Sequence, residues 1–205
     1  MKFIEKYLRD AQEIIDKLDK TSIERIINLI SAARERQGRM FILGVGGGAG
    51  HAGHAVCDFR KTVQIEAYAP TDNVSELTAR INDEGWDTCY ANWLKASNLR
   101  KGDIVFVFSV GGGNAEYNLS VNIIRALELA RERGVAIAGI VGRDGGETAR
   151  LADACIIIPQ VSPEMTTAQT ESFQALIWHL IVSHPKLCAA KMRWESASES
   201  QEGAK

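Results

Sequence analysis

Five short apolar runs, each followed by a segment long enough to form a helix, constrain the fold of this chain more than any other feature. The runs occupy residues 40–43, 65–69, 104–108, 136–141 and 154–158. Their length and apolar composition are typical of strands buried on both faces of a parallel sheet. Helix-length segments lie between them, at residues 49–62, 73–81, 91–96, 119–133 and 147–152. Strands that alternate with helices predict an α/β protein, a three-layer αβα sandwich around a five-stranded parallel sheet.

Apolar residues at helical spacing mark both ends of the chain. They predict two N-terminal helices within residues 3–33, the second capped by Ser22, and a last helix over 167–183. The polar residues 191–205 are expected to form a disordered tail, which leaves residues 1–190 as a single domain.

The N-terminal helices carry more apolar side chains than one packed face needs. A sheet of this size is covered by its own helices, so we expect an oligomer built through Phe3, Tyr7, Ile14 and Ile15. Packing of these residues within the chain is the alternative.

The composition argues against several classes of function. The chain has 205 residues, 45% of them hydrophobic, and is long enough to bury a full core. Lys and Arg total 24 against 26 Asp and Glu, so we expect neither nucleic acid nor a membrane as a partner. The apolar runs are far shorter than the ~18 residues of a membrane helix, and the N-terminus is charged, which predicts a cytoplasmic protein without a signal peptide.

The four cysteines are predicted to be free thiols. Cys57, Cys89, Cys155 and Cys188 are widely spaced and form no C-x-x-C pair. Neither a disulfide framework nor a thiolate zinc site is indicated, and we expect buried, reduced side chains.

Two glycine-rich loops follow predicted strands at the same edge of the sheet. Gly44-Val45-Gly46-Gly47-Gly48 follows the first strand, and Ser109-Val110-Gly111-Gly112-Gly113 follows the third. Open α/β sheets bind ligands at this edge, where amide hydrogens and helix N-termini face a phosphate and glycine allows its close approach. For either loop alone, simple reversal of the chain is the alternative.

The first loop nearly fits a dinucleotide-binding fingerprint, but the rest of that fingerprint is missing. An acidic residue is expected at the end of the next strand, whereas Glu66 lies inside that strand. No Gly-Lys-Ser/Thr follows either loop. We therefore expect no nucleotide cofactor.

Histidines and carboxylates recur on two predicted helices. His54 and Asp58 are four residues apart, and Glu171 and His179 are eight apart, so each pair projects from about one helix face. Two imidazoles and two carboxylates suit a divalent metal, zinc foremost, and equally a proton donor and acceptor pair. An ordinary surface pair and a buried structural histidine are the alternatives. His51 is a further candidate, one turn before His54, without a partner in the pattern.

Two more segments complete a resemblance to a known family. They are P-T-D-N-V-S-E-L-T-A-R-I-N-D-E-G-W at residues 70–86 and G-R-D-G-G-E-T-A-R-L-A-D at residues 142–153. With the glycine loops, they make the chain resemble a sugar isomerase (SIS) domain, and most of all the phosphoheptose isomerases, over residues 3–187. The resemblance implies a flavodoxin-like fold and a homotetramer with active sites between subunits. It also implies an aldose-ketose isomerase that converts sedoheptulose 7-phosphate to D-glycero-D-manno-heptose 7-phosphate for heptose or surface-polysaccharide precursors.

The resemblance also assigns roles to residues. Metal-containing members hold zinc at the positions of His54, Asp58, Glu171 and His179, where Asp58 replaces a glutamate and Glu171 a glutamine. For catalysis we predict Asp58 or Glu171 as the base and His179 as acid or base at the other carbon. The predicted substrate-binding residues are Gly46, Gly47, Gly48, Asn82, Asp83, Ser109, Gly111, Gly112 and Ser120.

The chain departs from the family where the phosphate is held. Val45 and Gly48 replace the asparagine and serine of G-N-G-G-S, and the loop from Ser109 replaces S-T-S-G-N-S and carries an insertion before Ser120. Backbone amides, Ser109 and Ser120 are left to hold a phosphate. A non-catalytic phosphosugar sensor, or an isomerase of a different phosphosugar, is therefore the alternative function.

Overall fold

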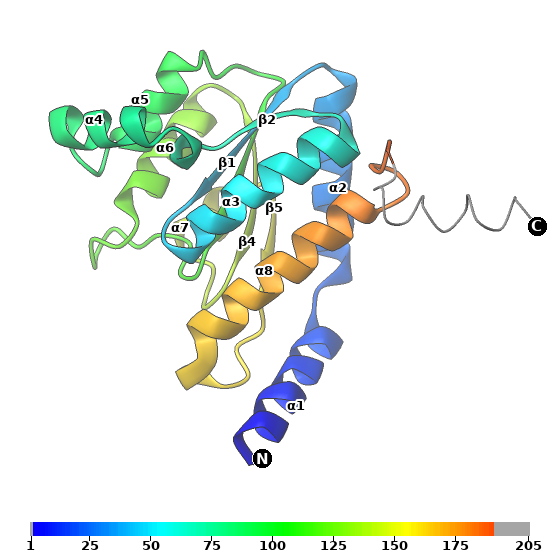
Figure 1. Cartoon of the computed structure of the whole chain (residues 1–205). Helices are drawn as coiled ribbons and strands as arrows, with labels where there is room; N and C mark the ends of the chain where they lie inside the picture. The colour runs from blue at the N-terminus through cyan, green and yellow to red at the C-terminus, as the bar shows by residue number, and fades with distance from the viewer. Residues whose placement is uncertain (1, 191–205) are drawn as a thin grey trace, which may run out of the picture.

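The computed structural model describes residues 2–190, and the tail expected at 191–205 lies outside them (Figure 1). The helices are α1 (Lys2–Lys17), α2 (Lys20–Glu35), α3 (Gly47–Asp58), α4 (Val74–Glu84), α5 (Cys89–Ala96), α6 (Val121–Glu132), α7 (Gly146–Leu151) and α8 (Thr166–Ser183). The strands are β1 (Arg39–Gly44), β2 (Glu66–Tyr68), β3 (Ile104–Ser109), β4 (Ala136–Val141) and β5 (Ala154–Ile157). Three short helices complete the chain: the π-helix η1 (Phe59–Val63) and the 3-10 helices η2 (Pro70–Asp72) and η3 (Pro163–Met165). All five predicted strands are present, and the predicted fold is confirmed.

The five strands form one parallel sheet in the order β2-β1-β3-β4-β5. All their carboxyl ends therefore lie at one edge. The chain passes from β1 to β2, which flanks β1 at one edge, and then to β3, which flanks β1 on its other side. The topological switch point therefore lies between β1 and β3. Ligands of flavodoxin-like sheets bind at such a point, and both glycine loops follow the strands that flank it.

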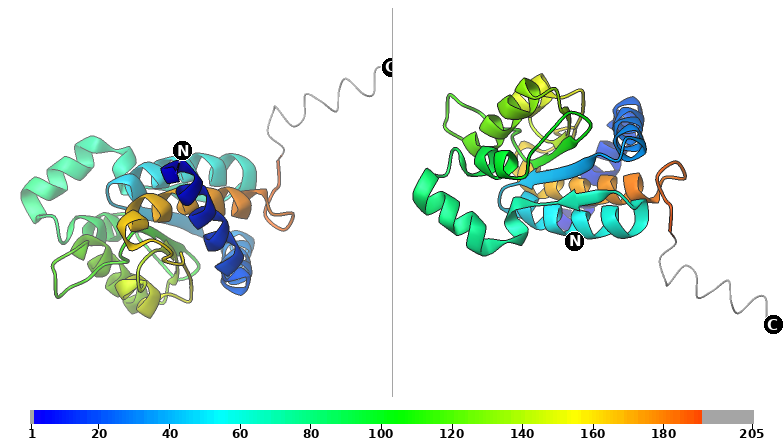
Figure 2. Two further views of the ribbon diagram at one scale, coloured as in Figure 1. Left: turned by 90° about the horizontal axis from the view of Figure 1, so that it is seen from below. Right: turned by 90° about the horizontal axis from the view of Figure 1, so that it is seen from above.

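Alternate residues of the central strands β1, β3 and β4 enter two separate cores, as expected for a sheet covered on both faces. The edge strands β2 and β5 bury one face only, which differs from the prediction. Met40 and Ile42 pack with α2, α3 and α8, whereas Phe41 and Leu43 pack with α5 and α6. Figure 2 shows these two groups of helices on opposite sides of the sheet. The three-layer arrangement holds α3 and α8 together on the same face, which matters for the site below.

The N-terminal helices differ from the expectation in two details. The cap of α2 is Asp19, not Ser22, because the Asp19 carboxylate accepts from the amides of Thr21 and Ser22 at 2.9 and 3.3 Å. The helix therefore begins at Lys20. In α1, Ile14 is fully buried in the core of its own chain and is not free for another subunit, so that assignment is wrong.

The cysteines are free, as predicted, but they are not all buried. Cys89 is buried, Cys155 is half-buried, and Cys57 and Cys188 are exposed. Burial raises the pKa of the Cys155 thiol to about 12. Within residues 2–190, no helix combines the length and the apolar character that crossing a bilayer requires.

Candidate active site

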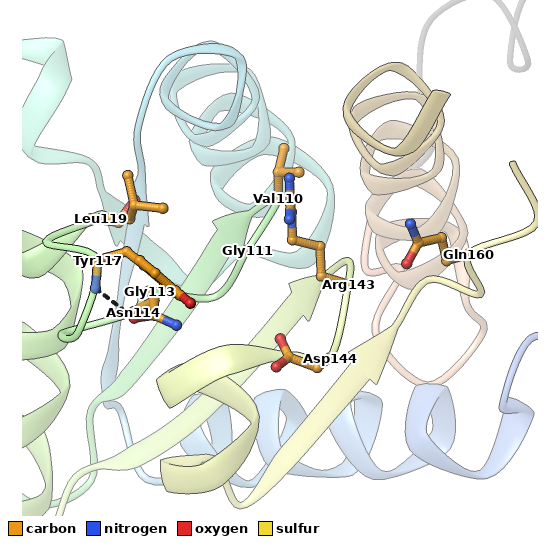
Figure 3. A pocket seen from close by; sticks show the side chains of 10 residues that line it. Val110, Gly111, Gly113, Asn114, Tyr117, Leu119, Arg143, Asp144 and Gln160 are labelled. Atoms are coloured by element: carbon orange, nitrogen blue, oxygen red, sulfur yellow. Dashed lines mark hydrogen bonds between the residues drawn. The ribbon is translucent and has the colours of Figure 1, made fainter. Parts of the chain in front are cut away.

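A cavity of about 520 Å³ opens at the carboxyl ends of β3, β4 and β5 (Figure 3). Its wall is built from the loops that follow these three strands, with Gly111, Gly113, Tyr117 and Ser120 after β3, Arg143 and Asp144 after β4, and Gln160 after β5. The predicted substrate residues Gly111 and Ser120 thus line this cavity, which lies toward β4 from the switch point between β1 and β3.

The loop after β3 is held in shape by hydrogen bonds between Gly112 and the residues Ser109 and Thr148. The Ser109 hydroxyl accepts from the amide of Gly112 at 3.0 Å, and the carbonyl of Gly112 accepts from the Thr148 amide and hydroxyl at 2.9 and 2.7 Å. Gly112 has a φ of 68°, and a side chain there would overlap the carbonyl of Gly145. Ser109 and Gly112 therefore shape the loop that presents Gly111 to the cavity.

The insertion forms a small hairpin at the rim of the cavity. Asn114 and Leu119 exchange two backbone hydrogen bonds of 2.9 Å, and the Asn114 side chain accepts from the amide of Tyr117. Tyr117 is 69% exposed and Leu119 is 59% exposed. Ser120 adopts a left-handed φ of 53°, so α6 begins at Val121 and not at residue 119 as predicted.

The first glycine loop does not line the cavity. Gly48 packs against the main chain of β3, and a side chain there would overlap the carbonyl oxygen of Phe108. The missing family serine is therefore incompatible with this backbone. Gly46 and Gly47 are exposed, and the Glu171 carboxylate stands over Gly47, 2.5 Å from where a Cβ would lie. Any substrate contact of Gly46, Gly47 and Gly48 stays a prediction.

Three of the four predicted metal ligands lie together. Asp58 Oδ2 is 3.9 Å from His54 Nε2 and 3.8 Å from His179 Nε2, and one ligand atom of each residue lies within 4.8 Å of the others. Asp58 is buried, whereas both histidines are exposed to solvent. Glu171 is not part of this cluster, and its role as a fourth ligand stays a prediction.

Helices α3 and α8 bring the three groups together because they run side by side in the same direction (Figure 1). Glu171 lies beside Gly47, the first residue of α3, and His179 lies beside Asp58, the last residue of α3. The His179 Nδ1 donates to the carbonyl of Ala175 at 2.7 Å, which leaves Nε2 directed at Asp58. Such a backbone partner fixes the ring of a metal-binding or proton-transferring histidine.

Sequence reasoning gave Trp178 no role beside the histidines. This residue is fully buried and contacts both imidazoles, with ring-centroid distances of 4.7 Å to His54 and 3.5 Å to His179. Its position directly before His179 was visible in the sequence. Its contact with His54 depends on the packing of two helices and was not.

His51 has a partner that its spacing did not show. Burial lowers the pKa of His51, and the nearby Glu171 carboxylate partly opposes this shift. His51 also packs edge-on against the ring of Phe108, with centroids 6.4 Å apart. His51 of α3 and Glu171 of α8 are therefore neighbours in the fold.

The cavity and the three-residue cluster are separate within one chain. Thr170 lies against Gly142, at the cavity end of β4, and nine residues of α8 carry the chain from there to His179. At 1.5 Å per residue, this is about 13 Å.

Asn82 and Asp83 are exposed on α4, where the Asn82 amide donates a hydrogen bond to the Asp83 carboxylate at 2.7 Å. They belong neither to the cavity wall nor to the cluster of His54, Asp58 and His179. Their substrate role stays a prediction.

Comparison with known proteins identifies the family. Residues 5–142 match the SIS domain. The chain is 30% identical over 182 residues to a probable phosphoheptose isomerase of Thermoplasma volcanium, covering 86% of this chain and 87% of that one. A phosphoheptose isomerase of Rhodospirillum rubrum is 29% identical over 165 residues, covering 78% and 82%. This chain belongs to the SIS domain family.

The solved structures agree. The phosphoheptose isomerase of Neisseria gonorrhoeae superposes with a TM-score of 0.75 at 26% identity, covering 88% of this chain and 92% of that one. The resemblance read from the glycine loops and the two longer segments is confirmed. The family match ends before α8, but this structural match covers most of the chain.

Proposed function

We propose that this protein is an aldose-ketose isomerase of a phosphorylated sugar, most directly sedoheptulose 7-phosphate, and that its product, D-glycero-D-manno-heptose 7-phosphate, enters heptose or surface-polysaccharide synthesis. Similarity to phosphoheptose isomerases over most of the chain supports an isomerase. The observation that carries the proposal is the cluster of His54, Asp58 and His179. A sensor needs a cavity for its ligand but has no use for an acid-base cluster held by two helices.

The reaction moves a proton between C1 and C2 through an enediol. It needs a base, an acid for the neighbouring oxygen and stabilisation of developing negative charge. Asp58 and His179 lie 3.8 Å apart and supply a carboxylate and an imidazole for these roles. With a metal bound, Asp58 would serve as a ligand and would be a weaker base. Glu171, which lies outside the cluster, is then the carboxylate left to act as base.

The residues fit a divalent metal such as zinc. Two imidazoles and one carboxylate form the three-ligand set of catalytic zinc sites, in which a fourth position stays open for substrate or water. His54, Asp58 and His179 would hold the ion, with the ring of His179 oriented by Ala175. When bound, the ion supplies polarisation of the carbonyl and hydroxyl oxygens of the substrate.

We also propose a homotetramer with active sites between subunits, in the cytoplasm, with residues 1–190 forming one SIS domain. Apolar side chains remain exposed on α1, at Phe3, Ile4, Leu8 and Ile15. The separation of about 13 Å between cavity and cluster along α8 supports the use of groups from two chains in one site. A stable monomer in sedimentation velocity would contradict the proposed homotetramer and its active sites between subunits.

A panel of sugars tests the activity. The metal-loaded protein is incubated with sedoheptulose 7-phosphate, with shorter ketose phosphates and with unphosphorylated sedoheptulose, and aldose formation is followed. The proposal expects turnover of phosphorylated ketoses, highest with the seven-carbon sugar, and none of the unphosphorylated one. Binding of sugar phosphates without any turnover would show a sensor instead.

A further inference from the structure

Arg143 projects its side chain into the wall of the cavity (Figure 3). Its backbone has a left-handed φ of 51° and is held in a tight turn, in which the Gly142 amide donates to Val110 and the Gly145 amide donates to Gly142, both at 3.0 Å. The Arg143 Cδ lies 3.7 Å from where a Cβ on Gly111 would be. The side chain therefore lies along the glycine loop that follows β3.

The guanidinium of Arg143 has no ion-pair or hydrogen-bond partner among residues 2–190. Arg39 and Arg150, by contrast, pair with Asp103 at 2.8 Å and with Glu147. The neighbouring Asp144 also lines the cavity, and its carboxylate accepts from the Gly146 amide at 3.3 Å without pairing with Arg143. A permanent cation that faces a cavity and has no internal partner is suited to an anionic ligand.

The surroundings of Arg143 add neutral donors. The amides of Gly111 and Gly113 have no acceptor within the described part of the chain, and both residues line the cavity. The Ser120 hydroxyl and the N-terminus of α6 close the same side. Amides in a glycine loop and at a helix N-terminus favour a phosphate, so the donors converge on one kind of group.

We propose that Arg143 is a specificity-determining residue that binds the phosphoryl group of the substrate, in place of the hydroxyls missing from the loop at Val110 and Gly111. This inference rests on the proposed function. Arginine offers two parallel N–H donors to a phosphate, which lysine cannot do. A site that relies on a charged donor binds phosphate more weakly as salt rises. It also discriminates strongly against a sugar without the phosphate.

Binding of inorganic phosphate tests the proposal without any turnover. Isothermal titration compares the wild type with Arg143→Ala, Arg143→Lys and the matched control Arg125→Ala, which removes an exposed arginine of α6 outside the cavity. We expect phosphate affinity to fall about tenfold or more in Arg143→Ala, since a hydrogen bond to a charged group is lost. Arg143→Lys should fall by a smaller factor, and Arg125→Ala should match the wild type.

The melting temperature without phosphate serves as the folding control and should be the same in all four proteins. With sedoheptulose 7-phosphate, KM should rise in Arg143→Ala more than kcat falls. Unchanged phosphate affinity in Arg143→Ala, or an equal loss in Arg125→Ala, would overturn the proposal. If no sugar phosphate is turned over but the phosphate affinities differ as expected, the proposed activity fails and the assignment of Arg143 stands.

Discussion

The Asp58 carboxylate of α3 lies 3.8 Å from Nε2 of His179 on α8. The contact joins two helices that are far apart in the sequence and that run in the same direction on one face of the sheet. It brings His54 into the same cluster, because His54 is one helical turn before Asp58. Glu171, on the same helix as His179, stays at the other end of α3.

This separation predicts different effects for the two carboxylates. Glu171→Gln should keep metal binding and lose turnover by about 10²- to 10⁴-fold, the usual contribution of a general base. Asp58→Asn should lose both, since it removes a ligand. Elemental analysis after zinc loading and dialysis gives the metal content. The exposed Glu132→Gln on α6 is the control and should retain both properties. Loss of zinc from Glu171→Gln to the level of Asp58→Asn would contradict the separation.

Metal binding should also stabilise the fold. A ligand that binds only the folded state at 100 times its Kd adds about 2.7 kcal/mol, which for a chain of this size raises the melting temperature by roughly 5–10 °C. Scanning calorimetry with zinc and after chelation measures the shift. His54→Ala should show little or no shift, whereas His184→Ala, at the end of α8 and outside the cluster, should respond like the wild type. An equal shift in His54→Ala would mean that zinc binds elsewhere.

The sequence predicted the sheet well because the central strands carry apolar residues on both faces, a pattern that packing confirms at Met40 and Phe41. Helical spacing also placed His54 and Asp58 correctly. For Glu171 and His179 it gave the shared helix face, but it did not show that eight residues separate the two backbones by about 12 Å along the axis. The unpaired state of Arg143 depends on a turn and a cavity, which no periodicity reveals.

Restoring the family serine at position 48 should destabilise the protein. A side chain on Gly48 would overlap the carbonyl oxygen of Phe108 in β3. Forcing extra atoms into such packing costs about 1–3 kcal/mol, so the melting temperature of Gly48→Ser should fall by several degrees. Gly50→Ser is the matched control, because nothing lies within 4 Å of a Cβ at that position. Equal melting temperatures for the two variants would show that the main chain of β3 shifts to accommodate the serine at little cost in stability.

The attachment of α1 should depend on pH through Asp10. The carboxylate accepts from Lys6 at 2.8 Å and from the Ser162 hydroxyl at 2.6 Å. These hydrogen bonds lower the pKa of Asp10, so its contribution to stability is present above the unfolded pKa of about 3.9 and is lost as pH falls through the lower folded value.

Asp10→Asn should therefore be less stable than the wild type at neutral pH, and the difference should shrink in acid. Urea unfolding from pH 7 down to pH 3 measures this. Asp16→Asn, an exposed change on the same helix, should differ little from the wild type at every pH. A difference for Asp10→Asn that stays constant over this range would exclude a role for its charge.

The most direct test of the account is proton transfer at the sugar itself. Metal-loaded wild type and His179→Ala are incubated with sedoheptulose 7-phosphate in D₂O, and NMR follows aldose formation and deuterium incorporation at C1 and C2. We expect both in the wild type, and neither in a His179→Ala variant that keeps the phosphate affinity of the wild type and the melting temperature of the metal-free wild type. Full isomerisation by His179→Ala, or phosphate binding by the wild type without any exchange, would contradict it.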